Sequence, residues 1–173
     1  TPMKSGLMFI DIVQARERIL YEKFLETAEN QNPVCQRLLF PQTISLNPAD
    51  AELLADILKE MRLLGFDIET FGKNTFVVNG LPADFSDQDI NDTIERLLES
   101  YKKNQLEASY EKKVNLIRSL AKNMAPRTTL QLTDEAMQAL AGQLFACSMP
   151  DTSPSGKKIL FILSNEEIEK KFK

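Results

Sequence analysis

The chain has 173 residues, of which 43% are hydrophobic and 27% are charged, and it lacks the run of roughly 20 apolar residues that spans a membrane. A net charge of −4 argues against a protein that grips nucleic-acid phosphates on its own, and the absence of histidine removes the commonest metal ligand and general base. The two cysteines, Cys35 and Cys147, match neither a disulfide framework nor a zinc site. We therefore expect a soluble, cytoplasmic domain and, because it begins at Thr1 without a methionine, a piece of a longer protein.

The first predicted elements are a buried strand at residues 6–11 and an amphipathic helix that follows it directly. Asp11 can cap this helix, because an Asp side chain at the N-cap accepts hydrogen bonds from the first backbone N–H groups. Ile19 and Phe24 contribute to an apolar side. The helix is expected to end at residues 30–33, where Asn-Gln-Asn-Pro breaks the pattern.

Residues 42–79 form a predicted βαββ unit. Asn47 and Pro48 suit the N-cap and first position of its helix, and Gly65 suits the position after its end. A Gly-Lys-Asn turn at residues 72–74 separates the last two strands, because Gly and Asn tolerate positive φ. The three strands are expected at residues 42–46, 66–71 and 75–79.

The second half of the chain is mainly helical. The apolar spacing of an amphipathic helix recurs at residues 90–101, 110–124 and 137–144. A strand is expected at residues 158–163. Ser164 and Glu167 then form the capping box of a short terminal helix.

The opening segment, residues 7–24, resembles the motif that begins the C-terminal domain of MutL mismatch-repair proteins. In that motif Asp-Gln-His-Ala is followed by two glutamates, and Asp11, Glu17 and Glu22 fit it. Residues 12–14 depart from the motif, because they are Ile-Val-Gln where the family's endonucleases carry Gln-His-Ala. The acidic residues of the motif are therefore present, and its histidine is absent.

A second part of the resemblance lies near the C-terminus, where family endonucleases carry Cys-Pro-His-Gly-Arg-Pro. Only Pro154 and Gly156 fit this pattern, and Ser153 and Ser155 stand in place of Cys and His. A two-metal nuclease needs several strong donors close together, and a neutral serine is a poor substitute for thiolate or imidazole. The resemblance thus implies a degraded endonuclease motif, with no catalytic residue, no metal and no other cofactor in this domain.

The three retained carboxylates have ordinary structural explanations. Glu17 and Glu22 lie about 140° apart around an α-helix, so they do not easily share one ion. In this interpretation Asp11 caps the helix, Glu22 pairs with Arg18, and Glu17 is a surface carboxylate. The alternative is a divergent manganese- or zinc-dependent nicking endonuclease that uses Asp11, Glu17, Glu22 and Cys147.

The resemblance implies an α/β (α+β) fold with two lobes. We expect a dimerisation lobe from residues 1–29 and 113–173, and an inserted regulatory lobe with the βαββ unit from residues 30–112. The implied function is homodimerisation and partner docking that couple mismatch recognition by MutS to strand processing, with DNA held by the full-length dimer. The ATPase, with its ATP and Mg, belongs to a separate N-terminal domain. A monomeric core stays open as the alternative, because periodicity does not distinguish it from a two-fold interface.

Residues 36–41, Gln-Arg-Leu-Leu-Phe-Pro, look like the family's sliding-clamp motif. An extended peptide can place Gln36 in a polar notch while Leu39 and Phe40 enter an apolar cleft, and a proline limits the conformations lost on docking. Two alternatives stay open: the apolar residues begin a strand packed under the regulatory lobe, or the chain is a structural dimer module without clamp contact. The predicted clamp-binding residues are Gln36, Leu38, Leu39, Phe40 and Pro41.

Six basic residues lie around the predicted helix at 110–124 and could help a dimer to hold DNA. Glu107 and Glu111 lie among them and the net charge is acidic, which favours a solvated helix face instead. The cluster comprises Lys102, Lys103, Lys112, Lys113, Arg118 and Lys122.

Overall fold

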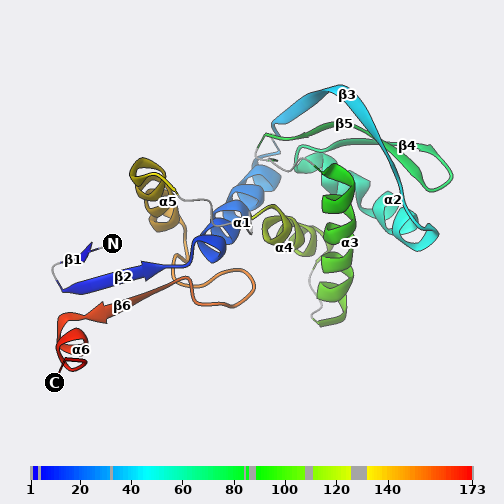
Figure 1. Ribbon diagram of the computed structural model, residues 1–173. Coiled ribbons are helices and arrows are strands. Elements are labelled where there is room, and N and C mark those ends of the chain that lie inside the picture. Colours follow the sequence, from blue (N-terminus) through cyan, green and yellow to red (C-terminus); the bar gives the residue numbers. More distant parts are fainter. Residues whose placement is uncertain are drawn as a thin grey trace. The chain divides into compact units, whose positions relative to one another are not determined.

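The computed structural model describes residues 2–3, 5–31, 33–83, 85, 89–107, 111–125 and 132–172 (Figure 1). These residues form helices and two three-stranded antiparallel sheets, which confirms the predicted α/β (α+β) class. The chain divides into two compact units, one made of Thr1–Glu22 with Ala125–Lys173 and the other of Lys23–Met124. Residue 110, the predicted start of a helix, lies outside the described residues.

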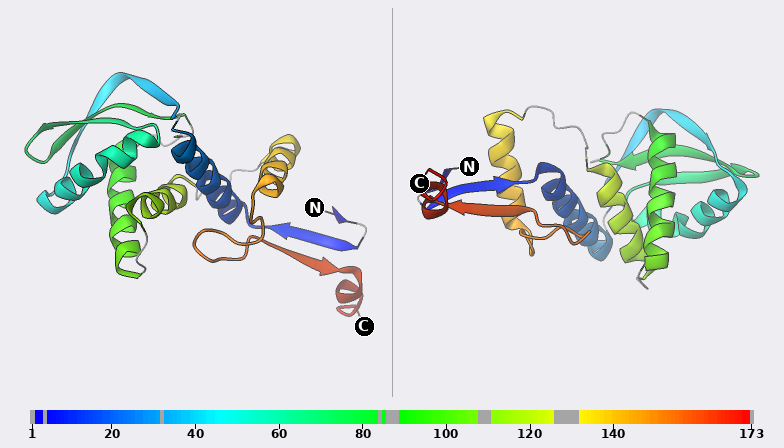
Figure 2. Two further views of the ribbon diagram at one scale, coloured as in Figure 1. Left: turned by 180° about the vertical axis from the view of Figure 1, so that it is seen from behind. Right: turned by 60° about the horizontal axis from the view of Figure 1, so that its bottom comes forward.

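The unit that joins both ends of the chain is built on a sheet of order β1-β2-β6. Strands β2 and β6 run antiparallel and lie side by side in every view (Figures 1 and 2). Strand β6 begins later than residue 158, because Lys158 pairs with Thr152 in a hairpin that precedes the strand. The elements are β1 (Pro2–Met3), β2 (Gly6–Ile10), the start of α1 (Ile12–Asn30), α5 (Asp134–Ala146), β6 (Leu160–Ser164) and α6 (Asn165–Glu169).

Short-range capping determines two helix starts in this unit, as predicted. The Asp11 carboxylate accepts hydrogen bonds from the backbone N–H groups of Val13 at 2.9 Å and Gln14 at 3.0 Å. Ser164 and Glu167 form a complete capping box at α6. Each cap satisfies N–H groups that have no partner within the helix itself.

The second unit contains a sheet of order β3-β5-β4. Its first strand starts at Cys35 rather than at residue 42, because residues 35–37 pair with Gly80–Pro82 of β5, which is longer than expected. The elements are the end of α1, β3 (Cys35–Ser45), α2 (Pro48–Leu63), β4 (Asp67–Gly72), β5 (Thr75–Pro82), α3 (Ile90–Glu107) and α4 (Lys112–Met124).

Helices α2, α3 and α4 lie on the same side of this sheet (Figure 1). The start of α2 is confirmed, since the Asn47 side chain accepts from the N–H of Asp50 and Pro48 is the first helical residue. Gly65 follows the helix end with a positive φ of 95°. Fully buried side chains from the three helices form the core of the unit: Leu54, Ile57, Met61, Ile94, Leu97, Leu98, Leu116 and Ile117.

A buried polar seam joins α3 to α4. Asn115 donates to the Tyr101 carbonyl at 3.0 Å, and Asn104 donates to the Ser119 hydroxyl at 3.0 Å. These contacts place α4 with α3 in the second unit, whereas the sequence analysis assigned residues from 113 onwards to the dimerisation lobe. Buried amides must find partners, and here those partners lie on α3. The assignment of dimerisation and regulatory roles to the two units stays a prediction.

The β2–β6 ladder depends on the missing side chain of Gly6. A Cβ at this position would lie 2.1 Å from the Leu163 carbonyl oxygen, and the residue has a φ of +152°. We expect Gly6→Ala to lower the free energy of unfolding by at least about 1–3 kcal/mol, because the strand must move or strain. Urea unfolding followed by circular dichroism measures this change.

Gly142→Ala is the matched control. Gly142 is exposed in α5 with no atom within 4 Å of an added Cβ. We expect it to raise the free energy of unfolding by roughly 0.5–1 kcal/mol, since alanine favours a helix over glycine. Equal effects of the two substitutions would contradict the role assigned to Gly6.

Candidate functional site

One face of α1 is polar and buried, and it carries the carboxylate that the sequence analysis placed on the surface. Glu17 is only 4% exposed, so that expectation is wrong. The Ser155 hydroxyl donates to Glu17 at 3.2 Å, and the Ser153 and Ser155 hydroxyls lie 3.0 Å apart. The fold therefore brings together three positions at which the resemblance placed metal ligands, with two hydroxyls beside one carboxylate.

Arg18 and Glu22 connect α1 to the segment that follows α5. The buried Arg18 guanidinium donates to the Thr152 carbonyl through Nε at 2.8 Å and lies 3.6 Å from Glu22, the predicted i, i+4 partner. Glu22 also accepts hydrogen bonds from the N–H and the hydroxyl of Ser148, both at 2.8 Å. Each polar group has a structural partner, as burial of a charge requires.

This set of donors does not fit a zinc or two-metal centre. Serine hydroxyls hold their protons near neutral pH and bind such ions weakly, and the Asp11 carboxylate is occupied by the helix cap. Among the residues that the structure describes, no group of three or more His, Cys, Asp or Glu side chains could hold a metal ion. Burial, and then the Glu22 carboxylate, raise the pKa of Cys147, so its thiol keeps its proton.

The β2–β6 ribbon is apolar on both faces. Ile10 and Leu160 point to one side and pack on the small core of Ala15, Leu144 and Ile159. Because directly opposed residues of an antiparallel pair share a face, the other side carries a second apolar set, which we call the open face. The open face consists of Leu7, Phe9, Phe161 and Leu163.

An aromatic pair lies at the centre of the open face. The rings of Phe9 and Phe161 stack with centroids 4.8 Å apart and planes 9° apart, yet the two residues are 45% and 49% exposed. Met137 and Phe145 of α5 are also about half exposed. None of the four residues of the open face was predicted as a site residue, although both strands are continuous apolar runs without alternation.

The predicted clamp motif forms a bulge in β3. Residues 38–41 leave the ladder between Arg37, which pairs with Gly80, and Gln42, which pairs with Val78. Leu39 and Phe40 are 93% and 83% exposed, which contradicts the alternative that they pack beneath the sheet. The bulge places two adjacent large apolar side chains in water on an edge strand.

Most charges of the basic cluster have interaction partners. Lys102 forms an ion pair with Asp50, and Lys112 lies 2.6 Å from Asp56. Lys113 donates to a backbone carbonyl of α1. Lys103 and Arg118 also have interaction partners. The interpretation as an ordinary helix surface is therefore favoured over a phosphate-binding patch.

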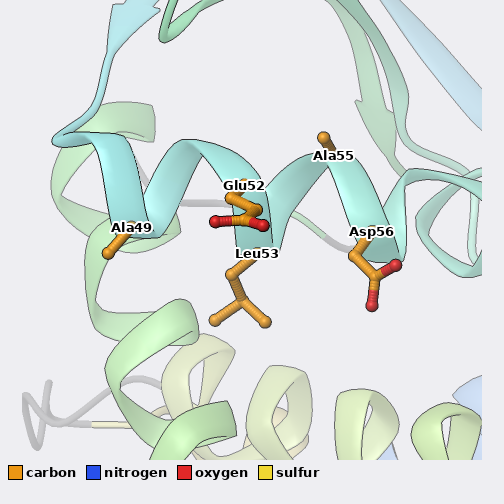
Figure 3. Close-up of a pocket in the computed structure, with 5 residues that line it drawn as sticks. All are labelled: Ala49, Glu52, Leu53, Ala55 and Asp56. Carbon is orange, nitrogen blue, oxygen red and sulfur yellow. The ribbon is translucent and has the colours of Figure 1, made fainter.

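A shallow groove of about 650 Å³ runs along α2 (Figure 3). It is open to solvent and mixes two carboxylates with small and apolar side chains, without a convergent polar site. The residues that line the groove are Ala49, Glu52, Leu53, Ala55 and Asp56.

Across the described part of the chain, no helix is long and apolar enough to cross a membrane.

Known proteins with similar sequences indicate where this chain belongs. A family model described as the MutL C terminal dimerisation domain matches residues 2–133. The DNA mismatch repair protein MutL of Flavobacterium psychrophilum is 33% identical over 171 residues, which is 99% of this chain and 28% of that protein. The proteins of the same name from Parabacteroides distasonis and Chlorobaculum tepidum are each 35% identical, over 100% and 98% of this chain.

The chain thus spans about 28% of the length of the curated relatives it matches. The match to the family covers most of the chain, including β2 of the open face, and it ends before β6. The chain belongs to the family of MutL C-terminal dimerisation domains.

Proposed function

We propose that this chain holds two copies of a MutL protein together through the open face of the β1-β2-β6 sheet. The half-exposed Phe9–Phe161 pair carries this proposal. In a two-fold symmetric dimer, the same surface of each copy contacts the other copy. The apolar residues of one open face therefore pack on the apolar residues of the second, and no other complementary surface is needed. Dimerisation is also the role that the description of the family gives.

The area of the open face indicates that the dimer interface extends beyond it. Full burial of a large apolar side chain contributes about 1.5–3 kcal/mol, so covering the exposed half of each contributes roughly 1 kcal/mol. A micromolar dissociation constant corresponds to a binding free energy of about 8 kcal/mol, which must remain after the entropic cost of association has been subtracted. The open face alone falls short of this, so we propose that further exposed apolar residues of the unit, among them Met137 and Phe145 of α5, are also buried in the dimer.

The dimer is tested by placing one charge on the open face. We expect Phe161→Glu to weaken self-association at least roughly 30-fold, because the carboxylate would be buried without a partner at the centre of the interface. Analytical ultracentrifugation at micromolar concentration measures the monomer–dimer equilibrium. Phe71→Glu, at an exposed phenylalanine in the second unit, is the control and should leave the dimer unchanged. A stable single-copy species of the unmodified chain would refute the proposal.

The second part of the proposal is partner docking by the bulge of residues 38–41. The replication sliding clamp is the partner that the motif suggests, with Leu39 and Phe40 as apolar anchors and Gln36 as the polar contact. The exposure of both anchors supports this role, since a folded protein gains nothing by leaving two adjacent large apolar side chains in water.

Clamp docking is tested with Leu39→Ala combined with Phe40→Ala. We expect binding to a purified bacterial sliding clamp to be lost in a calorimetric titration, while the circular dichroism spectrum stays the same because both residues are exposed. Val34→Ala removes an exposed apolar residue just before β3 and should retain full affinity. Unchanged affinity of the double variant would remove the clamp from the proposal.

The remaining functions belong to the rest of the protein. We place MutS contact, DNA binding and an ATPase with its ATP and Mg in a full-length cytoplasmic dimer, of which this chain is about a quarter by the length of its relatives. No cofactor is assigned to this chain. Its role is to join two copies and to bring the clamp to them, which couples mismatch recognition to strand processing.

We propose that the chain does not itself cut DNA, because the retained Glu17 faces two serines and no thiolate or imidazole. A metal-dependent nicking endonuclease is the rival. We expect no manganese- or zinc-dependent nicking of supercoiled plasmid above the level of a Glu17→Gln variant. This substitution keeps the shape of the buried side chain and its contact with Ser155, so a loss of folding does not confuse the result. Nicking that disappears with Glu17→Gln would establish the rival.

A further inference from the structure

The bulge of β3 is anchored to the sheet on both sides. Before it, Cys35, Gln36 and Arg37 pair with Pro82, Leu81 and Gly80, and after it the ladder resumes at Gln42 and continues to Ser45. We infer that the sliding clamp takes this bulge in its preformed shape, with β3 paired to β5 throughout. This inference rests on the proposed clamp contact and specifies how it is made.

The register explains why the motif is accessible without unfolding. From Arg37 to Gln42 the strand β3 advances by five residues, while its partner β5 advances by two, from Gly80 to Val78. Three extra residues therefore loop out of the ladder, and the usual alternation of side chains is broken. As a result, the consecutive residues Leu39 and Phe40 are both exposed.

The polar contact of the motif is also accessible in the folded state. Gln36 is exposed although its backbone is paired with Leu81. Strand β3 lies at the edge of its sheet, so no other strand of the described residues covers its outer side. The three side chains expected to contact the clamp are thus reachable while the pairing with β5 is intact.

The paired segment of β3 before the bulge, residues 35–37, is closely packed against β5. The Cys35 sulfur lies 2.5 Å from the place where a Cβ on Gly80 would be, so this glycine allows the thiol to rest on β5. Leu81 and Pro82, the partners of Gln36 and Cys35, are buried. Peeling this part of β3 away would break its ladder and expose buried apolar surface, which is a cost that docking in place avoids.

Preorganisation also predicts a difference between the folded chain and a free peptide of the same sequence. A free peptide must fix its backbone when it binds, whereas the bulge is already held at both ends. We expect a synthetic peptide of residues 33–43 to bind the clamp at least about tenfold more weakly than the folded chain. Equal affinities would overturn the inference.

A disulfide that joins this paired segment of β3 to β5 provides the direct test. Cys35 lies directly opposite Pro82, and opposed Cα atoms of antiparallel strands are about 4.5–5.5 Å apart, a span that a disulfide accepts. Pro82→Cys, combined with Cys147→Ser to remove the other thiol, allows the first part of β3 to be locked by oxidation and released by reduction. The same pair of substitutions with Cys35→Ser cannot form the lock and is the matched control.

We expect the oxidised and reduced forms to bind the purified clamp with affinities within about twofold of each other. A loss of tenfold or more that appears on oxidation, is reversed by reduction and is absent from the control would show that β3 must detach, and would overturn the inference. If neither form binds while both are folded, the proposed clamp contact itself fails.

Hydrogen exchange of the unmodified chain gives an independent measurement if the Pro82→Cys variant does not fold. Clamp binding should leave the backbone N–H groups of β3 in their ladder, so their exchange should stay as slow as in the free chain or become slower. Faster exchange at residues 35–37 in the complex would overturn the inference.

Discussion

The β2–β6 ribbon has two apolar faces, and the described core of its unit covers part of one of them, where Ile162 is still 49% exposed. The small core of Ala15, Leu144 and Ile159 takes the side with Ile10 and Leu160. The other side, with its stacked aromatic pair, is left half in contact with water. An open apolar sheet face of this kind needs a cover, and an identical copy provides one of matching size and chemistry. The proposed self-association thus rests on the composition of two five-residue strands and not on a catalytic or charged group.

The polar face of α1 has a different use. Arg18 and Glu22 hold the segment after α5, and Glu17 holds Ser155 in the hairpin that leads into β6. The helix thereby positions the strand that completes the ribbon. Removing one member would leave a buried charge or hydrogen-bonding group without its partner, which costs more than losing a surface ion pair. The carboxylates of Asp11, Glu17 and Glu22 thus each have a hydrogen-bonding role within the fold.

Local chemistry determined what could be predicted from the sequence. The caps at Asp11, Asn47 and Ser164 depend on neighbours within three residues, and each was predicted correctly. The burial of Glu17 was missed, because its partner lies 138 residues away. The early start of β3 depends on the distant strand β5, and the position of α4 depends on amides that resemble surface residues in the sequence. The open face could not be recognised from the sequence, because a strand with an apolar residue at every position is expected to be buried on both faces. The sequence does not show whether the protein's own core or a second molecule covers each face.

The two proposed surfaces lie in different units of the chain, yet their energetics are linked. Two exposed apolar anchors contribute at most about 3–6 kcal/mol on burial, and association of two proteins costs about 4–15 kcal/mol in lost freedom of motion. In the proposed function, a single bulge would therefore dock weakly, even when it is preorganised. A dimer carries two bulges, and once one is bound the other is held near the clamp at a high effective concentration, provided that the geometry allows both to engage. In the proposed function, dimerisation through the open face would thus strengthen docking through the bulge by raising the effective concentration of the second bulge.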